Sequence, residues 1–298
     1  MKRFFYSLTF LIITGMLFFS CTQKPSENVI EVTAKDFYFY TQDTIPSGWD
    51  TFRFNNQGHA HHFFFLTLLP DNIGFQQYIS ELVPPFAMTM DSLKAGMDKA
   101  SAGAMLGGML PEWYASAKTM GGAGIIQPGK SEEITIKLEP GNYVMECYVK
   151  TPEGKFHSEL GMIRPIFVTA KNSGIKEPAD ANMNISLYND KIETEGKIAA
   201  GHNVVAVHFK EHPQYGLGND VHVVKLTDET DIDTVISWMN WMNVNGLQTP
   251  APAKFMGGTQ EMPVGYTSYF TVNLEPGKYA WISETAVDRK MLKVFTVD

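Results

Sequence analysis

Cysteine is scarce in this sequence, with two residues, Cys21 and Cys147, in a chain of 298. Two thiols allow at most one disulfide bond within the chain. Basic residues are outnumbered by acidic ones, 24 to 32, and they are scattered rather than clustered. Phosphate binding relies on concentrated positive charge, so we expect no nucleic-acid partner. The 44% hydrophobic content is typical of a globular protein, and the length is sufficient for two domains.

The N-terminal segment 1–21 differs from the rest of the chain. Lys2 and Arg3 precede an apolar run, and the run ends at Ser20 and Cys21. Such a segment is a targeting signal rather than part of the fold. A cysteine after a small residue at this place resembles the lipobox of bacterial lipoproteins, which implies that Cys21 is acylated and becomes the mature N-terminus. A signal peptide that merely contains a cysteine and a retained anchor helix are the alternatives.

Cys147 ends a strand-like run that begins at Tyr143, and a second such run begins at Met162. The connection between them carries His157, so a thiol, an imidazole and a thioether share one loop. Thiolate and thioether favour copper, and imidazole suits copper as well as zinc. A buried free cysteine that only fills space is the alternative. If Cys21 carries lipid, however, Cys147 is the only thiol in an exported protein, where thiols usually form disulfides, and a metal explains it better.

Histidines cluster at the start of another strand-like run. His59, His61 and His62 follow a polar turn and precede the apolar segment 63–66. Neighbouring strand residues point to opposite faces, so His61 and His62 are not expected to bind one metal together. His59 is interpreted as a solvated turn residue. A polar cap over an aromatic strand, with no metal, is the alternative for all three.

This order of residues resembles the cupredoxin family, in which one His precedes a loop that carries Cys, His and Met. The resemblance implies that His61, Cys147, His157 and Met162 bind one type 1 copper ion per chain, with His62 in the position after the first ligand. His62 is the alternative to His61 as the first ligand. It also implies that the Cys147 thiolate carries most of the electronic coupling and that Met162 is a weak axial ligand. The loop histidine would lie near an exposed apolar end where a redox partner docks.

The rest of the chain predicts an all-β protein with two domains. Alternating apolar residues indicate strands at 29–34 and 131–138, whereas 71–120 and 231–243 have helical spacing. With the resemblance, the prediction is two tandem cupredoxin-like Greek-key β-sandwiches, each with a helical insertion. The expected boundaries are a signal peptide at 1–21, a tether at 22–28, a copper domain at 29–170, a linker at 171–181 and a second domain at 182–298.

The second domain repeats the first. Met120-Gly-Gly matches Met256-Gly-Gly, and the Leu-Glu-Pro-Gly segment at 138 recurs at 274, so both pairs are 136 residues apart. At this offset Cys147 falls on Ser283, and the following loop is shorter and has no His. His222 lies near the place of the first ligand. We therefore expect the second domain to bind no copper and to serve as a structural partner, or else as a binding surface.

These features predict a copper-binding lipoprotein of the bacterial cell envelope, held in a lipid membrane through acylated Cys21 on the periplasmic or other extracytoplasmic side. The expected role is one-electron transfer with a redox partner protein of the envelope. Copper binding or buffering without redox activity, or a structural role in an envelope complex, is the alternative. In related copper enzymes a His beside the copper Cys bridges to a second copper; here the neighbours are Glu146 and Tyr148, so we do not expect an enzyme.

Overall fold

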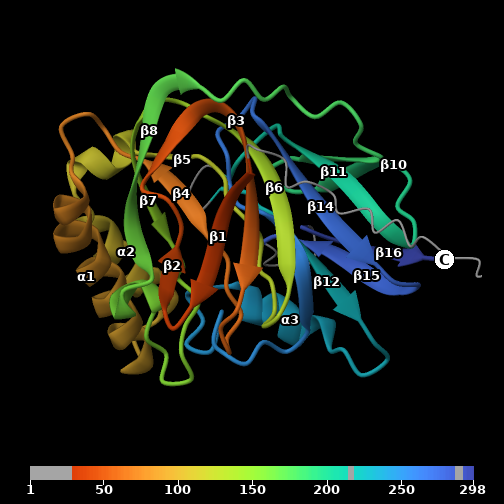
Figure 1. The fold of residues 1–298 in the computed structure, drawn as a ribbon. Helices are drawn as coiled ribbons and strands as arrows, with labels where there is room; N and C mark the ends of the chain where they lie inside the picture. The colour runs from red at the N-terminus through yellow and green to blue at the C-terminus, as the bar shows by residue number, and fades with distance from the viewer. Residues whose placement is uncertain (1–28, 214–217, 286–290) are drawn as a thin grey trace, which may run out of the picture.

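The computed structural model describes residues 29–213, 218–285 and 291–298. The predicted targeting segment 1–21, including Cys21, and the tether 22–28 lie outside the described residues. The described chain consists mainly of β-strands with three α-helices, and the two sequence repeats form two neighbouring sandwiches (Figure 1). The predicted all-β, two-domain architecture is confirmed. Within the described residues, no helix has the length and apolar character needed to cross a membrane.

The first sandwich is organised around one long strand that belongs to both of its layers. The strands are β1 (Val29–Lys35), β2 (Tyr38–Tyr40), β3 (Thr44–Asn56), β4 (Phe65–Leu68), β5 (Lys118–Thr119), β6 (Ser131–Leu138), β7 (Gly141–Glu146) and β8 (Ile163–Asn172). The C-terminal part of β3 lies between β1 and β6, whereas its first residues pair with β8. β8 continues to β7, β4 and β5. Alternate residues of β1 are buried, which is the pattern of a strand with one face on a core.

A helical insertion follows β4. It comprises α1 (Phe75–Lys94), α2 (Lys99–Met109) and the short 3-10 helix η1 (Glu112–Ser116). α1 places Tyr78 and Leu82 in a small apolar cluster with Val144 of β7, so the insertion covers that side of the sandwich (Figure 1). The Asp98 side chain accepts the Ser101 N–H and caps α2.

The second sandwich repeats this plan. Its elements are β9 (Met183–Leu187), β10 (Ile192–Gly196), β11 (Gly201–Phe209), β12 (Val221–Leu226), α3 (Ile232–Met239), β13 (Lys254–Thr259), β14 (Thr267–Leu274), β15 (Gly277–Ile282) and β16 (Leu292–Val297). One layer has the order β10-β9-β11-β14 and the other the order β13-β12-β15-β16. α3 lies between β12 and β13, as the predicted insertion required.

The two sandwiches share a continuous sheet. β6 of the first repeat pairs antiparallel with β14 of the second, and Ile134 lies opposite Phe270. These two residues are 136 positions apart, so each repeat contributes the same strand to the junction. Buried Glu132 adds a second connection, because its carboxylate accepts the N–H groups of Gly124 and Gly258 at 3.1 Å each. The domains therefore meet as an approximately two-fold pair rather than as separate units on a linker.

Candidate metal centre

Two imidazoles and one thiol meet inside the first sandwich. The Cys147 sulfur lies 3.9 Å from Nδ1 of His62 and 3.8 Å from Nδ1 of His157. The two imidazole rings are 4.9 Å apart between centroids. All three side chains are buried, with exposures of 1% or less. Because one ligand atom of each residue lies within 4.8 Å of the other two, a single ion can contact all three.

The structure places His62, rather than the expected His61, beside the Cys147 sulfur. His61 turns the other way, and its ring lies 6.4 Å from that of Trp238 and 6.3 Å from that of Phe255, both in the second domain. A short antiparallel bridge pairs His62 with Ile126. This pairing fixes the backbone at this point, and with it the side to which each histidine side chain points. The two histidines point to opposite faces, as strand alternation requires, but the pairing with Ile126 decides which one faces the sulfur.

The protonation chemistry of the cluster suits a metal cation. Burial lowers the pKa of His62 to about 3 and that of His157 to about 4, so both imidazoles are neutral at physiological pH and have a free lone pair. Burial also raises the pKa of the Cys147 thiol to about 12, although the backbone N–H groups of Phe63 and Val149 donate to its sulfur. A bound cation would supply the charge that the thiolate needs, and the two amide donors would then support it.

Met162 is buried next to the cluster and is tied to both loop ligands through its backbone. Its carbonyl accepts the Cys147 N–H at 3.1 Å, and its own N–H donates to the His157 carbonyl at 2.9 Å. The turn before it uses Gly161, whose φ of 105° is readily adopted only by glycine. The loop thus holds Cys147, His157 and Met162 in a fixed relation. The axial role of the Met162 thioether stays a prediction.

Two further residues shape the centre. Phe37 lies in the turn between β1 and β2, and its ring is 4.8 Å from that of His157, which it covers. Gly58 lies under the other imidazole, since a Cβ atom at this position would be 2.8 Å from Nε2 of His62. Sequence reasoning missed both. The Asn-Gln-Gly sequence before His59 was a signal for a turn, but nothing in it indicated contact with the ligand.

The strand register shows which residue of the second repeat corresponds to the first ligand. Phe65 lies opposite Glu146, and His222 lies opposite Ile282. Glu146 and Ile282 are 136 positions apart, so His222 corresponds to Phe65 and not to a ligand. Asn219, three residues earlier, stands where the ligand histidine stands in the first repeat.

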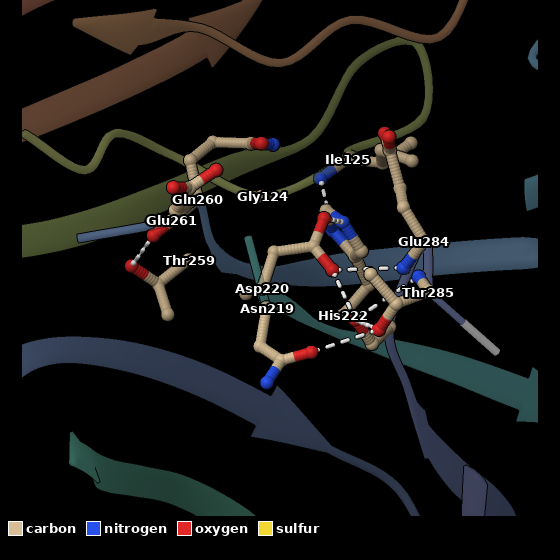
Figure 2. A network of polar contacts seen from close by, with 12 residues as sticks. Gly124, Ile125, Asn219, Asp220, His222, Thr259, Gln260, Glu261, Glu284 and Thr285 are labelled. Atoms are coloured by element: carbon tan, nitrogen blue, oxygen red, sulfur yellow. Dashed lines mark hydrogen bonds and ion pairs between the residues drawn. The ribbon is translucent and has the colours of Figure 1, made fainter. Parts of the chain in front are cut away.

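Hydrogen bonds replace the metal ligands in the second repeat. Ser283, the counterpart of the cysteine, donates to Oδ1 of Asp220 at 2.7 Å. Thr285 donates to Oδ1 of Asn219 at 2.9 Å (Figure 2). The Ser283 N–H donates to the Met291 carbonyl at 3.1 Å, the same contact that joins cysteine and methionine in the first repeat. The frame of the loop is therefore kept while its metal-binding side chains are absent.

Both repeats are β-sandwiches, as the sequence predicted. A thiol and two imidazoles within one sandwich are the donor set expected for copper, and they fit it in number and spacing. Beside the cysteine, Glu146 accepts a hydrogen bond from Tyr78 at 2.5 Å, and Tyr148 donates to Glu284 at 3.1 Å. Neither neighbour is a histidine.

Comparison with known proteins gives weak similarities. No protein-family model matches the chain, and no curated protein does. An auracyanin of Roseiflexus castenholzii is 22% identical over 49% of this chain and 99% of its own, with a TM-score of 0.26. Auracyanin A of Chloroflexus aurantiacus, a blue copper protein, is 20% identical over 47% of this chain and 98% of its own, with a TM-score of 0.29. A copper-containing nitrite reductase of Thermus scotoductus is 10% identical over 91% of this chain and 61% of its own, with a TM-score of 0.22. Values this low carry no functional information, so the functional assignment rests on the strands and side chains of this chain.

Proposed function

We propose that the first cupredoxin-like domain holds one copper ion in a type 1 site and that the protein transfers single electrons. The observation that supports this most directly is the buried cluster of His62, Cys147 and His157, with Met162 on the same loop. Copper bound by a thiolate and two imidazoles exchanges one electron between its Cu(I) and Cu(II) states.

The protein would hold the ligands of such a site in fixed positions. The ligand side chains come from segments fixed by backbone pairing, with His62 bridged to Ile126 and Cys147 bonded to Met162. Interiors packed in this way resist displacement. The ligands therefore keep nearly the same positions in both oxidation states, and little rearrangement opposes electron transfer.

The Phe37 side of the centre carries exposed apolar side chains. Phe37 is 36% exposed and contacts the His157 ring, and Leu160, in the short helix that begins at His157, is 43% exposed. Phe37 is therefore an exposed apolar side chain in contact with a histidine that is itself buried. We propose that a redox partner protein of the cell envelope docks here and that electrons pass through His157.

The same proposal includes the location. The apolar run before Cys21 supports export and acylation, so the protein would be held on the extracytoplasmic side of a bacterial membrane. Labelling of growing cells with a radioactive fatty acid tests this. Label should enter the wild-type protein and should be lost in Cys21→Ala, and an unlabelled wild-type protein would contradict the lipid anchor.

The visible spectrum tests the copper site. The chain without residues 1–21 is titrated with Cu(II), and we expect an intense blue or green thiolate charge-transfer band at one copper per chain that is absent in Cys147→Ser. Copper uptake without this band would contradict the redox proposal and favour copper buffering. A stoichiometry above one copper per chain would reopen the possibility of a catalytic copper centre.

A further inference from the structure

A cavity of about 380 Å³ lies between the two domains and the inserted helix α1. It is separate from the metal centre, although Tyr148, which follows Cys147 in the chain, forms part of its wall. Its aromatic lining includes Phe65, Tyr78, Phe86, Tyr148, Phe156 and Trp241. A cavity of this size and composition is typical of a small-molecule site.

The charged side chains that line the cavity are mostly acidic. Four carboxyl groups contribute to it, from Glu146, Asp220, Glu261 and Glu284. Among the described residues that line it, the single basic side chain is Lys118, which is half exposed. Its Nζ lies 3.4 Å from Oε2 of Glu139, a residue that does not line the cavity. The cavity therefore brings four carboxyl groups together with one basic side chain at its lining.

Each of the four carboxyl groups accepts at least one hydrogen bond. Glu146 accepts from Tyr78, Glu261 accepts the Gly218 N–H at 2.8 Å, and Asp220 is the centre of the network in Figure 2. Glu284 differs: its Oε2 accepts the Tyr148 hydroxyl at 3.1 Å, but its buried Oε1 has no partner among the described residues. This side chain is 8% exposed, so the unpartnered oxygen is costly unless a ligand reaches it.

A metal ion is a poor match for this group of residues. Asp220, His222 and Glu284 do place ligand atoms within 4.8 Å of one another. However, Nδ1 of His222 accepts the Ile125 N–H at 3.1 Å, so Nε2 must carry the proton that it shares with Asp220 at 2.8 Å. A protonated nitrogen cannot bind a metal. Asp220 also accepts from Ser283 and from the Glu284 N–H, and its oxygens are therefore occupied.

We propose that the cavity binds a small organic cation, a protonated amine with an apolar body, and that Glu284 is its ion-pair partner. The ammonium group would donate to the unpartnered Oε1, and the aromatic walls would contact the apolar body and the charge, as aromatic rings do with cations. Burial raises the pKa of Glu261 to about 7 and that of Glu284 well above its usual range, which fits a site that lacks its counter-charge. This inference does not depend on copper.

Calorimetry with the metal-free, full-length protein in detergent tests the proposal. The probes are benzylammonium, its neutral analogue benzyl alcohol, and MnCl2 as a divalent cation. We expect benzylammonium to bind at one site per chain, at least tenfold more tightly than benzyl alcohol. Equal binding of the two would overturn the proposal, as would saturable Mn²⁺ binding that excludes the amine, or no benzylammonium binding at all.

Variants locate the site. Glu284→Gln keeps the side-chain shape and should weaken benzylammonium binding at least tenfold. The control is Glu195→Gln, which changes an exposed side chain of β10 and should leave the binding unchanged. If Glu284→Gln does not fold, Glu261→Gln removes a second lining carboxyl group and should also weaken binding. Unchanged binding in the folded cavity variants would show that the amine binds elsewhere and would overturn the proposal. Because the protein carries no copper in this assay, the result is independent of the copper proposal.

Discussion

Tyr148 and Glu284 occupy the same position in the two repeats, and their side chains are hydrogen-bonded to each other across the domain junction at 3.1 Å. Each follows the residue at the metal position, which is Cys147 in the first repeat and Ser283 in the second. The segment that carries Cys147 is therefore hydrogen-bonded directly to the second domain.

Tyr148→Phe should destabilise the protein because it removes the hydroxyl that donates to Glu284. The loss of a partner for a buried carboxyl group costs about 1–3 kcal/mol in the free energy of unfolding. Urea unfolding of Tyr148→Phe, Glu284→Gln and the double variant gives the coupling energy of the pair. Strictly additive effects would show that the two side chains do not interact.

Replacement of His62 and of His61 by alanine, each in its own variant, should affect copper binding differently. His62→Ala removes a ligand and should abolish the charge-transfer band. His61→Ala should keep the band and lower the stability by about 1 kcal/mol, because its ring packs against Trp238 and Phe255 of the second domain. Loss of the band in His61→Ala with retention in His62→Ala would refute the ligand assignment.

Gly58→Ala should weaken copper binding while the protein stays folded. The added methyl group would lie 2.8 Å from Nε2 of His62 and would displace the ring. Disturbance of groups that orient a metal ligand typically costs about 10–100-fold in affinity. Gly108→Ala is the matched control, because nothing lies within 4 Å of a Cβ atom there. Copper affinity is measured by competition with a chelator, and equal affinities for the two variants would contradict the contact.

Asp50→Asn should change the pH dependence of stability. Burial raises the pKa of Asp50 from 3.8 to about 7, so the folded protein holds this proton more tightly than the unfolded chain does. The stability contributed by the protonated form is fully present below about pH 4 and is lost as the pH rises towards 7. The neutral amide avoids this loss, so the variant should gain about 2–4 kcal/mol relative to wild type between pH 5 and pH 8. Urea unfolding of both metal-free proteins at these two pH values measures it, and a pH-independent difference would contradict the raised pKa.

Phe37→Ala should open the metal centre to small molecules. The ring covers His157, which is itself fully buried, and its removal exposes the ligand without changing it. We expect the visible band to persist and the rate of oxidation by a small inorganic oxidant to rise severalfold. Tyr40→Ala, which removes another exposed ring of the same hairpin, is the control. Equal rates in the two variants would show that Phe37 does not limit access.

Local sequence predicted much of this protein correctly. The alternating strands, the helical insertions and the repeat at an offset of 136 residues follow from short-range patterns, and the structure has them. The loop from Cys147 to Met162 was also visible, because its residues are close in the chain. The replacement of the cysteine by Ser283 in the second repeat was visible from the offset alone.

Tertiary structure decided the rest, because these features depend on contacts between distant segments. Alternation showed that His61 and His62 face opposite sides, but only the pairing of His62 with Ile126 determined which one meets the sulfur. The register of β12 against β15 likewise moved His222 away from the ligand position. The acidic cavity also required the two repeats to pair through β6 and β14, because Glu146 of the first repeat meets the three carboxyl groups of the second only after the domains come together.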